Sequence, residues 1–163
     1  MAEDDATHPS VRPAATMATN SARHTCNQLI RRCIDMHRLY RHAAQAVNEP
    51  GLRAVLGEDA QALASVVIEL QHDVALAGGE ARRHGSWRSA LRCRLVESMA
   101  RATARYDHAW IRALAQDEGT LLRAFEHAIA ELPEDTARVL RRQLPRLRSV
   151  HLDMHNLAGA AHS

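Results

Sequence analysis

Four long segments of the chain repeat apolar residues at spacings of three and four, and this pattern constrains the fold more than any other feature. Such spacing places apolar side chains along one face of a helix, and that face must be buried against another element. No segment shows the strict alternation that is typical of a half-buried strand. We therefore predict an all-α fold built as an antiparallel four-helix bundle, with helices over about residues 25–47, 50–77, 106–131 and 133–159.

Short breaks separate the first helix from the second and the third helix from the fourth. Residues 48–51 read Asn-Glu-Pro-Gly, and Pro50 suits the first turn of the second helix. Gly78 and Gly79 end that helix, and Pro133 followed by two acidic residues begins the fourth. Connections as short as these join helices that are antiparallel neighbours.

The two ends of the chain lack the helical pattern. Residues 1–22 contain Pro9 and Pro13 among Ala, Thr and Ser, a composition typical of a disordered tail. Thr25 and Gln28 have the spacing of a capping box, which predicts the start of the first helix. We expect one bundle domain over residues 23–159, between a disordered tail at 1–22 and a short tail at 160–163.

A long connection from residue 80 to about residue 105 joins the second helix to the third. Ser86 is a suitable cap for an extra short helix inside this crossover. The crossover is rich in arginine, which indicates either an anion-binding face or a solvated face without a ligand. The candidate anion-binding residues are Arg88, Arg92, Arg101 and Arg105.

Four titratable residues fall inside the apolar stripes when each helix is projected at 100° per residue: His37, Asp59, Asp117 and His151. Buried carboxylates without partners are costly, so each aspartate should pair with a histidine or share a cation. One interpretation pairs His37 with Asp59 and Asp117 with His151. The other is a site for a divalent metal ion with these four ligands, to which Glu118 adds an oxygen.

Two further motifs are assigned to ordinary surface and core positions. Glu69 and His72 have the Glu-x-x-His spacing of di-iron bundles, but they project away from the stripe, which predicts an exposed pair. The cysteines Cys26, Cys33 and Cys93 show no C-x-x-C spacing. We expect them to be reduced thiols that pack as small apolar side chains.

The charge and the absence of known motifs narrow the function classes. With 21 basic and 19 acidic residues, the net charge of +2 does not indicate a nucleic-acid or membrane partner. No apolar run reaches membrane-spanning length and no secretory signal opens the chain, so we expect a cytoplasmic protein. Nucleophile elbows, Gly-rich phosphate loops and the H-E-x-x-H motif are absent, which argues against an enzyme.

A set of turn residues and spacings from Leu29 to about Leu157 carries a likeness to a known family. The set comprises Leu29-Ile30, Asp35, Tyr40, Glu49-Pro50-Gly51-Leu52, Leu70, Gly78-Gly79, Gly85-Ser86, Glu118, Phe125 with Ala128, and Leu132-Pro133. In these residues the chain resembles an uncharacterised bacterial family of ferritin-like four-helix-bundle proteins of unknown function. The resemblance implies a ferritin-like bundle with a long crossover, a context of stress responses and no established reaction.

One departure from that family bears on metal binding. Relatives tend to carry acidic residues and a histidine in the middle of the second helix, whereas residues 61–67 here read Gln-Ala-Leu-Ala-Ser-Val-Val. This stretch offers no metal ligand, which argues against a di-iron centre of the ferroxidase type.

Two functional interpretations remain open. The first is a non-catalytic structural or interaction protein that self-associates through a second apolar edge of the third helix, formed by Ile111, Leu122 and Ile129. The alternative is a ferritin-like protein that binds iron, manganese or zinc at a degenerate site in the bundle core.

Overall fold

The computed structural model describes residues 13–101 and 106–160, without the side chains of residues 13–18, 87–90, 99–101, 106 and 160. Over these residues the chain forms five helices and no strand. The helices are α1 (Pro13–Ala46), α2 (Pro50–Leu76), α3 (Trp87–Arg101), α4 (Tyr106–Glu131) and α5 (Glu134–Ala160). The prediction of an all-α bundle is confirmed. No helix in the described ranges has both the length and the apolar character needed to cross a membrane.

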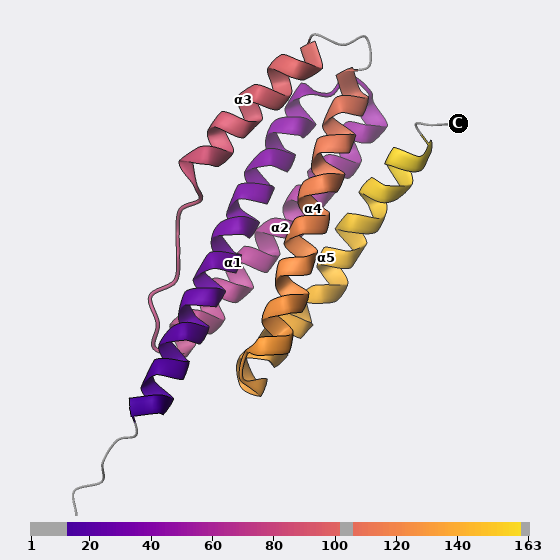
Figure 1. The fold of residues 1–163 in the computed structure, drawn as a ribbon. Coiled ribbons are helices and arrows are strands. Elements are labelled where there is room, and N and C mark those ends of the chain that lie inside the picture. The colour runs from indigo at the N-terminus through magenta and orange to yellow at the C-terminus, as the bar shows by residue number, and fades with distance from the viewer. Residues whose placement is uncertain (1–12, 102–105, 161–163) are drawn as a thin grey trace, which may run out of the picture.

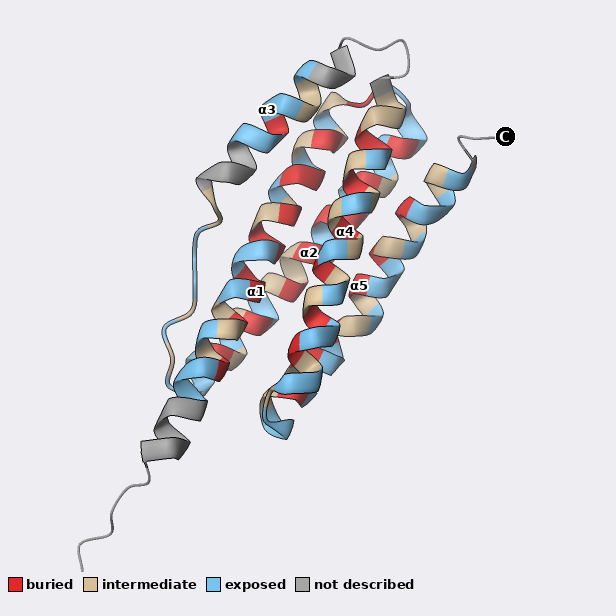
Figure 2. Cartoon of the chain, viewed as in Figure 1, coloured by how far each residue is buried: buried red, intermediate tan, exposed pale blue. Residues whose placement is uncertain are grey.

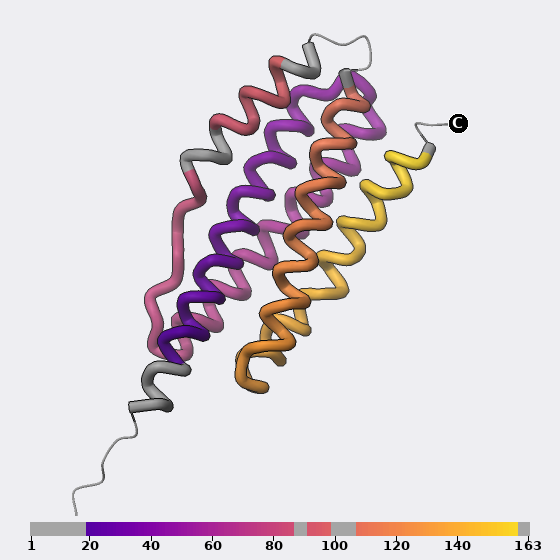
Figure 3. Tube along the Cα trace, in the orientation of Figure 1, coloured from indigo at the N-terminus to yellow at the C-terminus, as the bar shows by residue number. Residues whose placement is uncertain are grey.

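The four long helices pack side by side, and α3 lies outside them (Figure 1). α1 packs against α2 and α4, while α5 packs against α4 and α2. After α2 the chain runs back beside α1 as an extended segment and then as α3, which contacts α1 and α4. This return along the length of the bundle makes α2 and α4 run in the same direction, as the tube in Figure 3 shows.

The ends of α2 match the turn chemistry of the sequence. The Glu49 carboxylate accepts hydrogen bonds from the backbone N–H groups of Gly51 and Leu52, and so caps the helix at its predicted start. At the other end Gly78 has a φ of 70°. Its N–H and that of Gly79 donate to carbonyls of the last turn, which closes the helix.

The first helix begins earlier than expected. α1 starts at Pro13, so residues 13–22 of the predicted tail are helical and Thr25 lies in the helix interior. Proline is favoured at the first position of a helix, and the alanines at 14, 15 and 18 are the best helix formers. The remaining parts of the predicted tails, residues 1–12 and 161–163, lie outside the described residues.

The core lies between the four long helices, where their buried faces turn inward (Figure 2). Its largest fully buried side chains are Trp110, Tyr40 and Phe125. The three free thiols are buried as expected, and burial raises the pKa of Cys33 to about 12. That thiol therefore stays protonated at neutral pH and packs as a small apolar group.

Two backbone contacts fix the crossover and α4 on the rest of the bundle. The N–H of Ser86 donates to Asp35 Oδ1 at 2.7 Å, and a Cβ on Gly85 would lie 2.2 Å from the same oxygen. A residue without a side chain is therefore required where the crossover meets α1. Asp107, in the first turn of α4, accepts hydrogen bonds from the N–H groups of Asn48 and Glu49.

Candidate functional site

Two carboxylates occupy core positions in the half of the bundle nearer the turn between α1 and α2. The exposed fraction of Asp59 on α2 is 5%, and that of Glu118 on α4 is 4%. Asp59 follows Leu56 by one helical turn, and Glu118 likewise follows Leu114. Each carboxylate therefore takes a place in a stripe that is otherwise apolar.

Three oxygens of these buried carboxylates have no hydrogen-bond partner among the described residues. They are Oδ2 of Asp59 and both carboxylate oxygens of Glu118. His151 on α5 lies beside Glu118, with Nδ1 3.6 Å from Oε2. That distance suits an ion pair but exceeds a hydrogen bond, and Nδ1 is itself buried without a partner. The site thus contains an acid and a base that nearly touch.

Burial and one neighbouring charge decide the protonation of both acids. Burial, and after it the charge of Asp153, raise the pKa of Glu118 to about 9. Burial also raises the pKa of Asp59 to about 7, followed by the charges of Asp153 and Glu58. Asp153 on α5 thus acts on both buried acids. We call Asp59, Glu118, His151 and Asp153 the core carboxylate cluster.

Neither of the predicted Asp–His pairs forms. Among the described residues, no hydrogen bond or ion pair joins His37 to Asp59. His37 is half-buried, and burial followed by the charges of Arg41 and Arg38 lowers its pKa.

Asp117 does not meet His151. Asp117 accepts a hydrogen bond from Arg92 on α3 at 2.5 Å, whereas His151 lies beside Glu118. Successive residues of a helix point 100° apart. An error of one residue in the predicted stripe therefore selected Asp117 as the core acid, whereas Glu118 is the acid that the structure buries. Burial raises the pKa of Asp117, whereas the charge and the hydrogen bond of Arg92 act in the opposite direction.

The five predicted metal ligands are only partly brought together. Glu118 and His151 are adjacent, but Asp117 is engaged by α3. Within the part of the chain that the structure describes, no three His, Cys, Asp or Glu side chains are grouped as a metal site requires. The arrangement can hold a proton on each buried acid, and it offers Glu118 and His151 as a starting pair for a cation.

Sequence reasoning missed Asp153, Tyr40 and Trp110 as polar groups of the core region. In the sequence, Asp153 stands between His151 and His155, and the rings of these two histidines are 6.2 Å apart. Its position two residues after His151 placed it outside the predicted apolar stripe. The Tyr40 hydroxyl and the Trp110 Nε1 are buried and find no hydrogen-bond partner in the part of the chain that the structure describes. A search for acids next to an i, i+4 histidine pair could have found Asp153, whereas no sequence signal marks an unpaired aromatic donor.

The exposed Glu69 and His72 are confirmed as surface residues. Glu69 nevertheless contacts α5, because it accepts hydrogen bonds from Gln143 Nε2 and Arg146 Nη1, both at 2.8 Å.

Of the predicted anion-binding residues, only Arg92 has a described side chain, and Asp117 neutralises it. The side chains of Arg88, Arg101 and Arg105 lie outside the described residues.

The fold and this site define the class of the protein: an all-α bundle whose core carries two buried acids, one of which lies beside a histidine. Residues 21–131 match the family described as a domain of unknown function, DUF2383, and the chain belongs to this family. The matched part contains Asp59 and Glu118, while His151 and Asp153 on α5 lie beyond it. No curated protein matches the sequence.

Proposed function

We propose that the protein is a non-catalytic, ferritin-like bundle that binds one divalent cation at the core carboxylate cluster. The observation that supports this proposal is the burial of Glu118, with both oxygens unpartnered beside His151. Removing a carboxylate from water is costly unless it keeps a proton or binds a cation. A single long crossover between two antiparallel pairs of helices is the connectivity of ferritin-like folds.

The residues of the cluster have the chemistry of a transition-metal site. Carboxylate oxygens and a neutral imidazole together suit zinc, manganese or iron. Glu118 and His151 would supply the first two ligands, and rotation of Asp153 and Asp59 would bring further oxygens. His37 and Asp117 are outside this proposed set, because Asp117 is held by Arg92. Three buried free thiols are in keeping with a reducing cytoplasm.

The proposal is tested by the metal content of protein purified without a tag or chelator, followed by calorimetric titration with Zn²⁺, Mn²⁺ and Fe²⁺. We expect about one equivalent of one metal, because the proposal places a single site in each chain. Glu118→Gln and His151→Ala should each abolish this binding. His72→Ala is the matched control, since it removes one exposed imidazole from α2.

Binding that disappears in His72→Ala and survives in His151→Ala would contradict the assignment. A wild-type protein that takes up no metal would leave the cluster as a pair of protonated acids in a scaffold.

Self-association through α3 is a second candidate function, supported by the exposure of its leucines. The edge predicted on α4 is largely covered, because Ile111 is 7% exposed and Leu122 packs against the core. Leu91 and Leu95, four residues apart on α3, are instead 51% and 56% exposed. Apolar residues at this spacing form one face of a helix.

Sedimentation velocity tests this second candidate. We expect a dimer that the double variant Leu91→Gln and Leu95→Gln dissociates. Ile68→Gln is the control, because Ile68 is 65% exposed on α2. A wild-type monomer at high micromolar concentration would rule out self-association, and dissociation by Ile68→Gln would move the interface to α2.

A further inference from the structure

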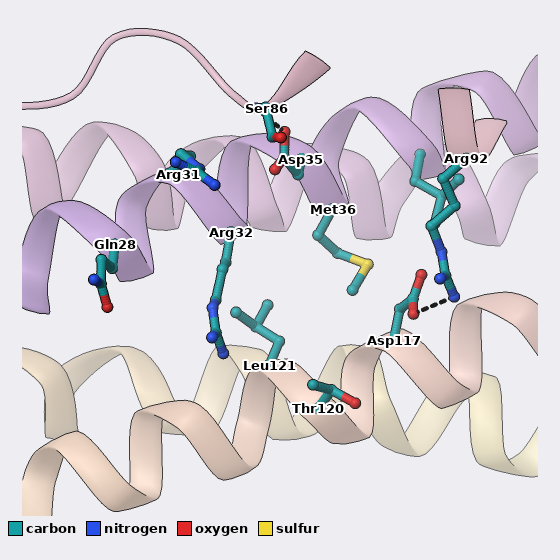
Figure 4. A pocket seen from close by; sticks show the side chains of 11 residues that line it. Gln28, Arg31, Arg32, Asp35, Met36, Ser86, Arg92, Asp117, Thr120 and Leu121 are labelled. Carbon is teal, nitrogen blue, oxygen red and sulfur yellow. Dashed lines mark hydrogen bonds and ion pairs between the residues drawn. The ribbon is translucent and has the colours of Figure 1, made fainter. Parts of the chain in front are cut away.

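A hollow of about 480 Å³ lies between α1 and α4, at the point where the crossover reaches α1 (Figure 4). Met36 and Leu39 of α1 and Leu121 of α4 give it an apolar floor. Polar side chains surround that floor: Gln28, Arg31, Arg32, Asp35, Ser86, Arg92, Asp117 and Thr120. A volume of this size is in the range of small-molecule sites.

The two carboxylates of this hollow are already engaged by the protein. Asp35 accepts the hydrogen bond from the Ser86 N–H, and Asp117 is paired with Arg92. Arg31 and Arg32, by contrast, make no hydrogen bond or ion pair within the described part of the chain. Their positive charges are therefore not neutralised by the carboxylates beside them.

The hollow continues along the same two helices toward the far end of α4. A second hollow of about 540 Å³ shares Gln28, Arg32 and Thr120 with the first. It adds Arg123, which donates to Thr120 Oγ1 and makes no ion pair with a described residue. The two hollows together form the α1–α4 groove, with Arg32 where they meet.

We infer that the α1–α4 groove binds a small organic anion through Arg32, whose side chain reaches from α1 toward α4 (Figure 4). A planar guanidinium presents two parallel N–H donors to a carboxylate or a phosphate, so either group fits Arg32. The apolar floor indicates that the anion carries a short apolar body, which would cover Met36 and Leu39. The inference does not depend on the core carboxylate cluster, which contributes no residue to the groove.

Isothermal titration calorimetry of the full chain at low salt tests this inference with three probes. Octyl phosphate and octanoate carry the two anionic groups on the same apolar chain, and inorganic phosphate carries no chain. We expect both octyl compounds to bind more tightly than inorganic phosphate. The ratio of their two affinities identifies the preferred anionic group. Equal affinity for inorganic and octyl phosphate would overturn the role of the apolar floor.

Variants separate this site from general attraction to a basic protein. Arg32→Gln should weaken the binding of octyl phosphate at least about tenfold, the effect of losing a charge-assisted hydrogen bond. Arg112→Gln is the matched control, since Arg112 is an exposed arginine of α4 that lines neither hollow. Equal weakening by Arg112→Gln, or no detectable binding of any probe at millimolar concentration, would overturn the inference.

A final variant keeps the two proposals apart. Glu118→Gln should abolish cation binding at the core and leave octyl phosphate binding unchanged. If this variant lost both cation binding and octyl phosphate binding, the anion would be assigned to the core. That result would contradict the assignment of the anion site to the α1–α4 groove.

Discussion

The interface between α2 and α5 has two ends that handle acidic residues in opposite ways. Toward the end of α2, Glu69 accepts hydrogen bonds from Gln143 and Arg146, and Asp73 accepts one from Arg142 at 2.8 Å. In the half of the bundle nearer the start of α2, Asp59 is buried. Among neighbouring charges, that of another acid, Asp153, has the largest effect on the pKa of Asp59.

The difference shows that exposure to solvent and hydrogen-bond donors together decide the protonation of an acid in this bundle. At the hydrogen-bonded end, donors from Gln143 and Arg146 lower the pKa of Glu69. At the other end, burial and the like charge of Asp153 raise the pKa of Asp59 and Glu118. The first end is therefore held by acids that accept hydrogen bonds from α5, whereas the second is stable only with protons or a cation.

The largest predicted effect is a dependence of stability on pH that originates at Glu118. The folded state holds its proton up to about pH 9, whereas the unfolded chain releases it at an ordinary carboxyl pKa. The free energy of unfolding should therefore be highest in acid and fall as pH rises, by about 1.4 kcal/mol per pH unit for each proton held. Urea denaturation of metal-free protein from pH 5 to pH 9 measures this slope.

Glu118→Gln should remove the part of the slope above pH 7. Asp59, whose pKa is about 7, then accounts for the part that remains at lower pH. A variant whose stability still falls between pH 7 and pH 9 as steeply as that of wild type would show that Glu118 is not the group that holds the proton. A bound divalent cation should also flatten the wild-type slope, because it replaces the proton.

The second prediction removes an acceptor from the hydrogen-bonded end. Glu69→Ala leaves Nε2 of Gln143 without its acceptor in a side chain that is fully buried. We expect a loss of about 1–3 kcal/mol in the free energy of unfolding, the cost of an unsatisfied buried donor. Thermal and urea unfolding at pH 7 measure it.

Glu126→Ala is the control for this loss. The two glutamates are alike in exposure, 46% for Glu126 and 47% for Glu69, and each pairs with an arginine of α5. They differ because, among the described residues, only Glu69 also accepts a hydrogen bond from the buried Gln143 amide. The control should cost less than about 1 kcal/mol. Equal losses in both variants would mean that the ion pair, and not the buried Gln143, carries the effect.

The third prediction concerns the charge that links the two buried acids. Asp153→Asn should lower the pKa of both Asp59 and Glu118, since its charge raises both. The free energy of unfolding at pH 8 should rise by up to about 1 kcal/mol, because Asp153 is partly solvated. Side-chain carboxyl NMR titration follows each acid.

Glu58→Gln is the matched control for this titration. The Glu58 charge acts on Asp59 and is not among the causes that raise the pKa of Glu118. The control should therefore move only the Asp59 titration. If the pKa of Glu118 changes equally in both variants, the two acids respond to a general negative potential. The charge of Asp153 would then have no specific effect on them.

The sequence pattern was sufficient for the helices but not for the partners of their polar residues. Four apolar stripes, Pro50 and Gly78 identify elements that depend on neighbouring residues, and the structure contains all four long helices. The first of them begins at Pro13, earlier than predicted. Whether Asp117 or Glu118 enters the core depends on a 100° step, which is smaller than the error of a stripe drawn from one sequence. Pairings such as Asp117 with Arg92 depend on the path of the crossover, which no local pattern determines.

The smallest predicted effect is the loss of an ion pair at the hydrogen-bonded end. Arg142→Gln removes the partner of Asp73, but the Asp73 side chain keeps 19% of its surface exposed and can be hydrated. The cost should stay below about 1 kcal/mol and should not change between pH 6 and pH 9, because this pair belongs to the hydrogen-bonded end of the interface, away from the two buried acids. Urea unfolding at both pH values measures it. A cost that grows with pH would mean that the two ends of the α2–α5 interface are electrostatically coupled. The acids at the two ends could then no longer be treated as independent groups.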